Sequence, residues 1–312
     1  MPLPFSDDSI FIAGHGGMVG SALLRQFKNE GHPKLITRSR AELDLTNQAA
    51  VNELFANQKP AVVIIAAAKV GGIHANKTYP ADFIRNNLQI STNLIEAAHE
   101  HGTKRLLNLG SSCIYPKDAP QPIAESSLLT GPLEPTNEAY AIAKIAALSM
   151  CRFYREQFGD TFHSVMPCNL YGPGDSYHPE NSHVIPGLIR RFHEAKIAQQ
   201  SSVQIWGTGI SRREFLHVDD LATACLHVLK MEDPPNLLNI GFGSDLPILD
   251  LAEKIAKVVG FSGEITLDPT KPDGVSSKLM DSSGIQSTGW SPTISLEVGL
   301  QNSYDDFKTN HG

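Results

Sequence analysis

A tyrosine and a lysine with three residues between them, Tyr140 and Lys144, have the spacing of a proton-transfer pair. On a helix such residues share one face, so the Lys144 ammonium would lie near the phenol and lower its pKa from about 10 towards neutral pH. Upstream, Ser111 offers a hydroxyl that could hold a substrate carbonyl or alcohol. Together they predict a site where hydride passes between a nicotinamide and a substrate carbon. The alternative is that Tyr140 only packs and Lys144 is solvated.

A second set of residues could bind phosphate. Gly14, Gly17 and Gly20 follow an apolar run, and Met18 and Val19 lie where a helix would begin. Glycines at this spacing permit a tight turn, close approach of a pyrophosphate and close packing of helix on sheet, while the helix N-terminus attracts the phosphates. The loop predicts dinucleotide binding, and an ordinary glycine-rich loop is the alternative.

Two arginines bear on the choice of cofactor. Arg38 and Arg40 stand near the end of the second predicted strand, where an NAD site usually places an acid. Guanidinium groups suit a 2′-phosphate, so we expect a preference for NADP. Asp44 and Leu45 could hold an edge of the adenine. The alternatives are solvated surface arginines and ordinary helix N-capping by Asp44.

The elements that must position these residues follow a β-α rhythm. Short aliphatic runs alternate with longer stretches that have apolar residues three or four apart, as in β-α-β units. This predicts the α/β class, with a Rossmann-type doubly wound parallel sheet and a smaller, mostly C-terminal substrate-binding lobe. Strands are expected at 10–13, 34–37, 61–67 and 105–109, and helices at 19–30, 48–57 and 84–101.

The second half of the chain indicates two interleaved domains. After Cys168 the sequence turns glycine-rich and polar as far as Ser182, as in a loop that lines a site. An alanine-rich helical stretch and the run 237–240 then indicate a return to the first sheet. We expect an NADP-binding Rossmann domain from 1–169 and 214–243, and a substrate-binding domain from 170–213 and 244–312.

Composition excludes several classes of protein. The 312 residues are 41% apolar and 19% charged, typical of a globular chain, and the net charge of −7 argues against nucleic-acid binding. The longest apolar run, 61–68, is too short to span a membrane, and the N-terminus does not resemble a secretory signal. Four scattered cysteines form neither a disulfide framework nor a zinc motif. We expect a cytoplasmic protein without a metal.

The order of the motifs resembles a known family. Gly-x-x-Gly-x-x-Gly, an upstream serine and Tyr-x-x-x-Lys are similar to the extended short-chain dehydrogenase/reductases. Longer strings resemble the GDP-L-fucose synthase family over almost the whole chain: Ala-Ala-Ala-Lys-Val-Gly-Gly-Ile at 66–73, Gly-Ser-Ser-Cys-Ile-Tyr-Pro-Lys at 110–117, 134–144, Asn-Ser-His-Val-Ile-Pro at 181–186, 213–220 and Lys-Pro-Asp-Gly at 271–274.

The resemblance implies a reaction on GDP-4-keto-6-deoxy-D-mannose, which is epimerised at C3 and C5 and then reduced at C4 with NADPH to GDP-L-fucose. Protons beside the ketone become removable when charge spreads onto its oxygen, which Ser111 and Tyr140 would stabilise. The positions that match the family's acid-base pair are Cys113 and His183. Taken alone, Cys113 is more often a small buried residue and His183 a satisfied loop histidine.

The resemblance also implies binding residues and a homodimer. Arginines can grip the diphosphate, Trp206 can lie against guanine and Asp281 can accept from sugar hydroxyls. A core position for Trp206 and a solvated Arg191 are the alternatives. The matching substrate positions are Asn169, Arg191, Trp206, Arg213, Lys271 and Asp281, and the further cofactor positions are Ala67, Lys144, Pro167, Asn169, Leu170 and His183.

One departure and two competing functions remain. Gly16 stands where members of the family often carry a basic residue, so NADP selection would depend more on Arg38 and Arg40. A related 4-reductase, 4-epimerase or dehydratase acting on a GDP-sugar is one alternative; Cys113 with His183 favours the synthase, and a dehydratase would need an acid near Cys113. A non-catalytic NADP-binding regulator is the other, and the intact tyrosine-lysine pair argues against it.

Overall fold

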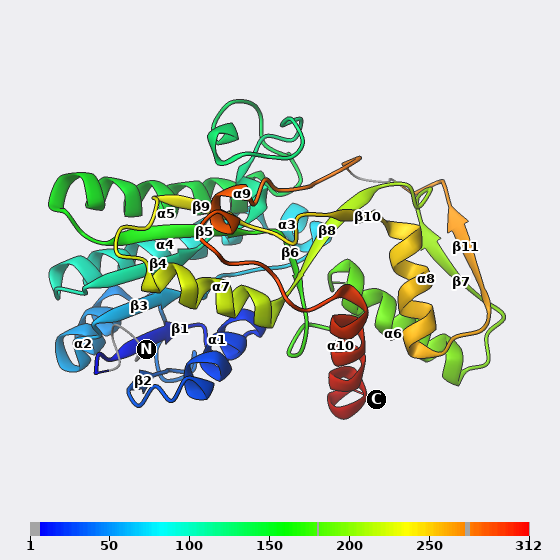
Figure 1. Ribbon diagram of the computed structural model, residues 1–312, viewed down its shortest axis with the longest axis horizontal. Helices are drawn as coiled ribbons and strands as arrows, with labels where there is room; N and C mark the ends of the chain where they lie inside the picture. Colours follow the sequence, from blue (N-terminus) through cyan, green and yellow to red (C-terminus); the bar gives the residue numbers. More distant parts are fainter. Residues whose placement is uncertain (1–6, 180, 272–274, 312) are drawn as a thin grey trace.

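A six-stranded parallel sheet forms the centre of the computed structural model, which describes residues 7–179, 181–271 and 275–311 (Figure 1). The strand order is β2-β1-β3-β4-β5-β9, and every pairing is parallel. The chain passes from β1 to β2 on one side and returns to β3 on the other, so a crevice for a ligand opens beyond the ends of β1 and β3. This confirms the predicted doubly wound sheet. The strands are β1 (Ile10–Ala13), β2 (Leu35–Ile36), β3 (Val62–Ile65), β4 (Arg105–Leu109), β5 (Phe162–Pro167) and β9 (Leu237–Ile240).

Helices cover both faces of this sheet, so its inner strands are buried on both sides. Alternate residues of β1 show the two faces: Ile10 and Ile12 pack with α1 and α7, whereas Phe11 and Ala13 pack with α2, α4 and α5 (Figure 1). The helices are α1 (Met18–Asn29), α2 (Gln48–Gln58), α4 (Pro80–Glu100), α5 (Glu138–Phe158) and α7 (Val218–Lys230).

The element boundaries differ from the predicted ones in physically understandable ways. β2 has only two residues because it is the edge strand and pairs with β1 alone. β3 ends at Ile65, after which the backbone amide of Ala66 still donates to Ala13 and the chain then turns away. α4 begins earlier than predicted, at Pro80, because the fixed φ of proline suits the first position of a helix.

The second half of the chain builds a smaller cluster of elements beside the sheet (Figure 1). Phe192, Leu251, Ile255 and Phe307 belong to its apolar core. A short sheet, in the order β10-β8-β6, connects the two halves. The elements are β6 (Asn169–Tyr171), α6 (Val184–Ile197), β7 (Ser202–Trp206), β8 (Arg212–His217), β10 (Asp245–Pro247), α8 (Ile248–Val259), β11 (Glu264–Asp268) and α10 (Leu296–Asn310), with the short turns α3 (Ile73–Thr78), η1 (Ser112–Ile114), η2 (Glu125–Ser127) and α9 (Ser283–Gln286).

We keep the division into two interleaved domains as a proposal, with one adjustment. Met280, Ile285 and Trp290 pack in the core of the first half rather than the second. The carboxylate of Asp220 on α7 also accepts hydrogen bonds from the backbone amides of Thr293 and Ile294. Residues 279–294 are therefore better assigned to the first domain than to the substrate-binding domain.

A loop after β6 connects the C-terminal helix with the start of α1. The amide of Gly174 donates to Asp306 of α10 at 3.0 Å, and a side chain added at Gly174 would meet Met18 and Ser21. Beside it, Oδ2 of Asp175 is buried without a hydrogen-bond partner among the described residues. Burial raises the pKa of Asp175 to about 7, and the charge of Asp306 adds to this effect.

Replacing Asp175 by asparagine should stabilise the protein in alkaline buffer. A carboxyl whose pKa is raised on folding contributes stability at low pH and loses it as the pH rises through the folded value, here about 7. Asp175→Asn should therefore raise the free energy of unfolding at pH 8 by about 1–2 kcal/mol, with a smaller gain towards pH 4. Urea unfolding across this range would measure it, with Asp118→Asn, at an exposed aspartate, as control. Equal unfolding midpoints for wild type and Asp175→Asn at pH 8 would contradict the assignment.

Candidate active site

The glycine-rich loop lies directly at the end of β1. Gly14 has φ +86°, and a Cβ there would come within 2.7 Å of the Ala67 backbone, whereas one at Gly20 would overlap the carbonyl of Gly14. A Cβ at Gly17 would meet only the Gly14 oxygen, at 3.6 Å, so this face of the loop is open. Gly14 and Gly20 thus allow the backbone to pack closely, and Gly17 leaves space at the N-terminus of α1. The loop has the shape that a pyrophosphate requires.

The end of β2 provides positive charge beside this loop. Arg38 is half-buried and donates from Nη1 to the carbonyl of Thr37 at 2.8 Å, and Arg40 is exposed. Asp44 accepts from the amide and hydroxyl of Thr46, so it closes a turn, while Asn47 caps α2. The alternative in which Asp44 caps the helix is therefore wrong, because Asn47 is the capping residue.

Leu45 and Ala67 are fixed in place near this positive charge. The carbonyl of Leu45 accepts from the side chain of Asn93 at 2.9 Å. Ala67 lies against Gly14, at the point where the chain leaves β3. Ala67 therefore borders the crevice beyond β1 and β3, and Leu45 is held by α4, which carries Asn93.

Tyr140, Lys144 and Ser111 come together at the end of β4. The buried ammonium of Lys144 donates to the carbonyl of Leu109 at 2.8 Å, and its Nζ lies 5.8 Å from the centre of the Tyr140 ring. Ser111 follows β4 directly, and its Oγ accepts from the amide of Cys113 at 3.5 Å. The helix and the strand end thus place a phenol, an ammonium, a hydroxyl and a thiol in one region.

The predicted lowering of the Tyr140 pKa is wrong for this arrangement. Burial raises the pKa of Tyr140, and the nearby Cys113 adds to the rise. Burial also lowers the pKa of Lys144 to about 8, because desolvation disfavours the charged form of either group. The phenol is therefore held in its protonated form, which suits donation of a proton to an oxygen that is gaining negative charge.

Cys113 has a charged neighbour that sequence reasoning missed. Burial raises the pKa of the Cys113 thiol, while the positive charge of Lys278 is the largest opposing influence. Lys278 lies two residues before Met280, whose amide donates to the fully buried carboxylate of Glu214 at 3.0 Å. The sequence signal was a lysine three residues before Asp281, a proposed substrate residue, but nothing nearby in the sequence connected it with Cys113.

His183 directly precedes the first residue of α6. Its side chain is reached by solvent, yet the atoms around it lower its pKa by desolvation. The preceding Asn181 packs against Gly72 in the loop after β3, since a Cβ at Gly72 would lie 3.4 Å from its carbonyl oxygen. Among the described hydrogen bonds, none joins His183 to Cys113 or Tyr140. The structure thus joins Cys113 to the Tyr140 region, and leaves His183 on a neighbouring loop.

The two arginines expected to bind substrate are both half-buried and hydrogen-bonded. Arg213 donates to the carbonyl of Val275 at 2.6 Å, and Arg191 donates to Gln204 while its buried Nε has no partner among the described residues. Burial lowers the pKa of both arginines. Arg191 is half-buried and already hydrogen-bonded, so the alternative of a solvated side chain is wrong.

Trp206, Asn169 and Asp281, which are also expected to contact the substrate, lie in different surroundings from the two arginines. Trp206 is 64% exposed, so the alternative of a core position is wrong, and the Lys271 ammonium lies 5.6 Å from the centre of its ring. Asn169 donates to the backbone of Glu214 at 2.8 Å, and Asp281 accepts from the amide of Ser283. Pro167 and Leu170, on either side of Asn169, lie at the end of β5 and in β6. Of the similar string 271–274, only Lys271 lies within the described residues.

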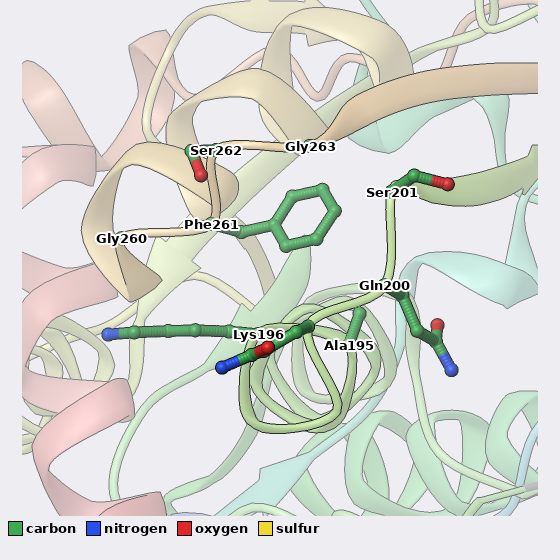
Figure 2. Close-up of a pocket in the computed structure, with 9 residues that line it drawn as sticks. Ala195, Lys196, Gln200, Ser201, Gly260, Phe261, Ser262 and Gly263 are labelled. Atoms are coloured by element: carbon green, nitrogen blue, oxygen red, sulfur yellow. The ribbon is translucent and has the colours of Figure 1, made fainter.

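A hollow lies in the C-terminal half, between the end of α6 and the residues that follow α8 (Figure 2). Its volume is about 430 Å³, and the Phe261 ring and the Lys196 side chain border it. The Lys196 ammonium donates to the carbonyl of Val259, at the end of α8. Over the described part of the chain, no three histidine, cysteine or acidic side chains gather as metal ligands would, and the helices there include none that could span a bilayer.

Comparisons with known proteins agree with this geometry. Residues 10–241 match the model of the NAD dependent epimerase/dehydratase family. The chain is 58% identical to GDP-L-fucose synthase 1 of Arabidopsis thaliana, over 96% of this chain and 93% of that protein. Among solved structures it resembles a GDP-6-OMe-4-keto-L-xylo-heptose reductase from C. jejuni (35% identity, TM-score 0.91, covering 98% and 99% of the two chains). It also resembles a GDP-L-fucose synthetase from Naegleria fowleri bound to NADP (26% identity, TM-score 0.90, covering 98% and 95%). The chain therefore belongs to the NAD dependent epimerase/dehydratase family and, within it, to the family of the GDP-L-fucose synthases.

Proposed function

We propose that the protein epimerises GDP-4-keto-6-deoxy-D-mannose at C3 and C5 and reduces C4 with NADPH, which gives GDP-L-fucose. The observation that carries this proposal is the position of Cys113 beside Ser111, Tyr140 and Lys144. A reductase needs only the last three residues, whereas an epimerase also needs a group that removes a carbon-bound proton. The relative from Arabidopsis thaliana supports the same activity.

In the epimerisation steps, Ser111 and Tyr140 hold the C4 ketone oxygen with neutral donors. Burial favours the thiol form of Cys113, and the positive charge of Lys278 opposes this effect. Once Cys113 has lost its proton, the thiolate removes a proton from a carbon beside the ketone, and the electron pair moves to the oxygen as an enolate. His183 returns a proton from the opposite face. Before the second carbon reacts, Cys113 releases its proton to solvent and His183 takes one up from solvent, so both groups return to their starting forms and the two inversions cause no net change in protons.

In the reduction step, the protonated phenol of Tyr140 is the proton donor. NADPH, when bound, would supply the hydride to C4. Tyr140 gives its proton to the C4 oxygen, and Lys144, held by the carbonyl of Leu109, stabilises the phenolate left behind. Burial raises the pKa of Tyr140, so the phenol carries the proton that this direction requires.

The open face of the glycine-rich loop and the charge at β2 fit NADP. The proposed contacts divide the cofactor into its parts: the pyrophosphate on the loop, the 2′-phosphate on the arginines and the nicotinamide near Tyr140. The pyrophosphate would lie on Gly14, Gly17, Met18, Val19 and Gly20, and the 2′-phosphate on Arg38 and Arg40. Asp44, Leu45 and Ala67 would surround the adenosine, and the residues near the nicotinamide would be Lys144, Pro167, Asn169, Leu170 and His183.

The GDP portion would lie along the second half of the site. Exposed Trp206 offers a flat surface for guanine, with Lys271 beside it, and the desolvated arginines suit the diphosphate. Asn169 and Asp281 would contact the sugar. We add Lys278 to this set, because its ammonium lies among Cys113, Arg213 and Glu134.

A GDP-sugar 4-reductase without epimerase activity is the second candidate. The C. jejuni reductase, which shares 35% of its sequence with this chain, supports it. For a reductase, however, Cys113 and its neighbour Lys278 would have no task. The two candidates differ in whether protons at C3 and C5 exchange with solvent.

We further propose a cytoplasmic homodimer. Ile142 and Phe153 lie about three turns apart on one face of α5 and are 42% and 51% exposed. An apolar helix face of this kind favours association with a second copy. All four cysteines are free, as in a reducing compartment.

Replacing Tyr140 by phenylalanine tests the proton donor. Tyr140→Phe keeps the ring against Phe83 but removes the hydroxyl, so we expect turnover with GDP-4-keto-6-deoxy-D-mannose and NADPH to fall about 10²–10⁴-fold. The loss of absorbance at the reduced-nicotinamide band would measure this, and a fluorescence titration should show unchanged NADPH binding. Tyr79→Phe, an exposed tyrosine, is the control. Full turnover in Tyr140→Phe would exclude its role, and no turnover in the wild type would exclude the reaction itself.

Replacing Cys113 by serine tests the proton-abstracting group. We expect Cys113→Ser to slow exchange of the C3 and C5 protons with solvent deuterium about 10²-fold or more, because an alcohol is far harder to ionise than a thiol. Reduction of a substrate already epimerised should change much less. NMR spectra in deuterated buffer would record the exchange, with Cys225→Ser, a buried cysteine on α7, as control. Exchange at wild-type speed in Cys113→Ser would show that another group is the base.

A further inference from the structure

A buried asparagine on α4 holds the start of the loop that follows β3. The side chain of Asn87 is 2% exposed. Its Nδ2 donates to the carbonyl of Lys69 at 3.0 Å, and its Oδ1 accepts from the amide of the same residue at 2.8 Å. Nδ2 also donates to the carbonyl of Phe83, one turn earlier in α4, at 2.8 Å. Both donor hydrogens of the amide are therefore used, and three hydrogen bonds fix its orientation.

A second asparagine holds the other end of this loop. Asn76 in α3 donates from Nδ2 to the carbonyl of Gly71 at 2.7 Å and to that of Gly72 at 3.1 Å. We call residues 69–72 the β3 loop. Because polar side chains bind its backbone at both ends, the β3 loop is part of the rigid frame of the site.

One side of the β3 loop packs beside the proposed proton donor. A Cβ at Gly71 would lie 3.2 Å from Cζ of Phe83, so the loop backbone lies directly against this ring. The Phe83 ring in turn meets the Tyr140 ring edge-on, with ring centres 6.3 Å apart. The Lys69 ammonium lies 5.6 Å from the centre of the Phe83 ring and pairs with Asp82 at 3.1 Å. The loop therefore has a defined position relative to Tyr140.

The end of the β3 loop packs against the segment that leads to His183. A Cβ at Gly72 would lie 3.4 Å from the carbonyl oxygen of Asn181 and 3.7 Å from that of Ser182. These two residues directly precede His183, which is itself the residue before α6. Because packed backbone atoms cannot overlap, the loop limits how closely this segment can approach the Tyr140 region. The β3 loop thus contacts both the ring beside the proton donor and the segment that carries His183.

We propose that the β3 loop sets the position of His183 relative to Tyr140. Asn87 and Asn76, which hold the loop, are then positioning residues for the epimerisation. This inference rests on the proposed function, in which His183 returns a proton to the sugar. A group that transfers a proton must lie within hydrogen-bond reach of its partner, so a displacement of about 1 Å slows the step strongly. Tyr140 and Lys144 depend much less on the loop, because α5 carries both and β4 binds the Lys144 ammonium.

Replacing Asn87 by leucine removes the anchor at the start of the loop. Leucine is close in size to asparagine but forms none of the three hydrogen bonds, so the loop should shift. We expect inversion at C3 and C5 to slow about 10- to 100-fold, and reduction of a substrate already epimerised to slow less than about threefold. NMR spectra without NADPH would record the inversion, and absorbance at the reduced-nicotinamide band would record the reduction. Gln89→Leu, which replaces an exposed amide on the same helix, is the matched control and should change neither rate.

A second variant disturbs the same contact from the loop itself. The β-branched side chain in Gly72→Val would press on the carbonyls of Asn181 and Ser182, while the hydrogen bonds of Asn87 stay in place. We expect the same selective loss of inversion. Thermal unfolding and a fluorescence titration with NADPH would show that each variant folds and binds the cofactor. If Asn87→Leu does not fold, Gly72→Val decides alone.

The outcomes separate this inference from the proposed function. Inversion at wild-type speed in the folded variants would overturn the role of the β3 loop and leave the epimerase-reductase activity intact. An equal loss of inversion and reduction would also overturn it, since the loop would then only support the fold of the site. A selective loss in only one of two folded variants would overturn the path through Gly72. A wild-type protein that reduces the epimerised sugar but inverts neither centre would overturn the epimerase part of the proposed function, on which the inference rests.

Discussion

A single hydrogen bond fixes the positions of the reactive groups relative to one another: the buried ammonium of Lys144 donates to the carbonyl of Leu109, the last residue of β4. It joins the helix that carries Tyr140 to the strand that leads into Ser111. Because an unpaired charge in the protein interior is costly, helix and strand cannot shift independently without losing this contact. Lys144 also lies beside the Tyr140 phenol. It therefore holds the helix against the strand and places a positive charge near the phenol.

Much of the fold follows from local patterns. The β-α rhythm predicted the parallel sheet, because inner strands covered on both faces must be apolar throughout, as Val62–Ile65 are. The lengths of β2 and β3 were less predictable, since they depend on which neighbour each strand pairs with. The packing of Met280, Ile285 and Trp290 in the first core is likewise a long-range event that no local pattern records.

The site was predictable in its residue types and less so in its electrostatics. The spacing of Tyr140 and Lys144 does place them on one face, yet burial reverses the expected direction of the tyrosine pKa. Desolvation depends on the whole fold and therefore cannot be judged from two residues. Lys278 was missed for a similar reason, because the chain carries it back to Cys113 from far along the sequence, where Glu214 fixes the neighbouring Met280.

The contact between Gly174 and Asp306 has a consequence for how the molecule matures. The loop that lies over the start of α1 is tied to α10, so the first lobe alone lacks this support for the start of α1. During synthesis the glycine-rich loop emerges well before α10. The start of α1 therefore gains this support only after α10 has been made and has packed in place.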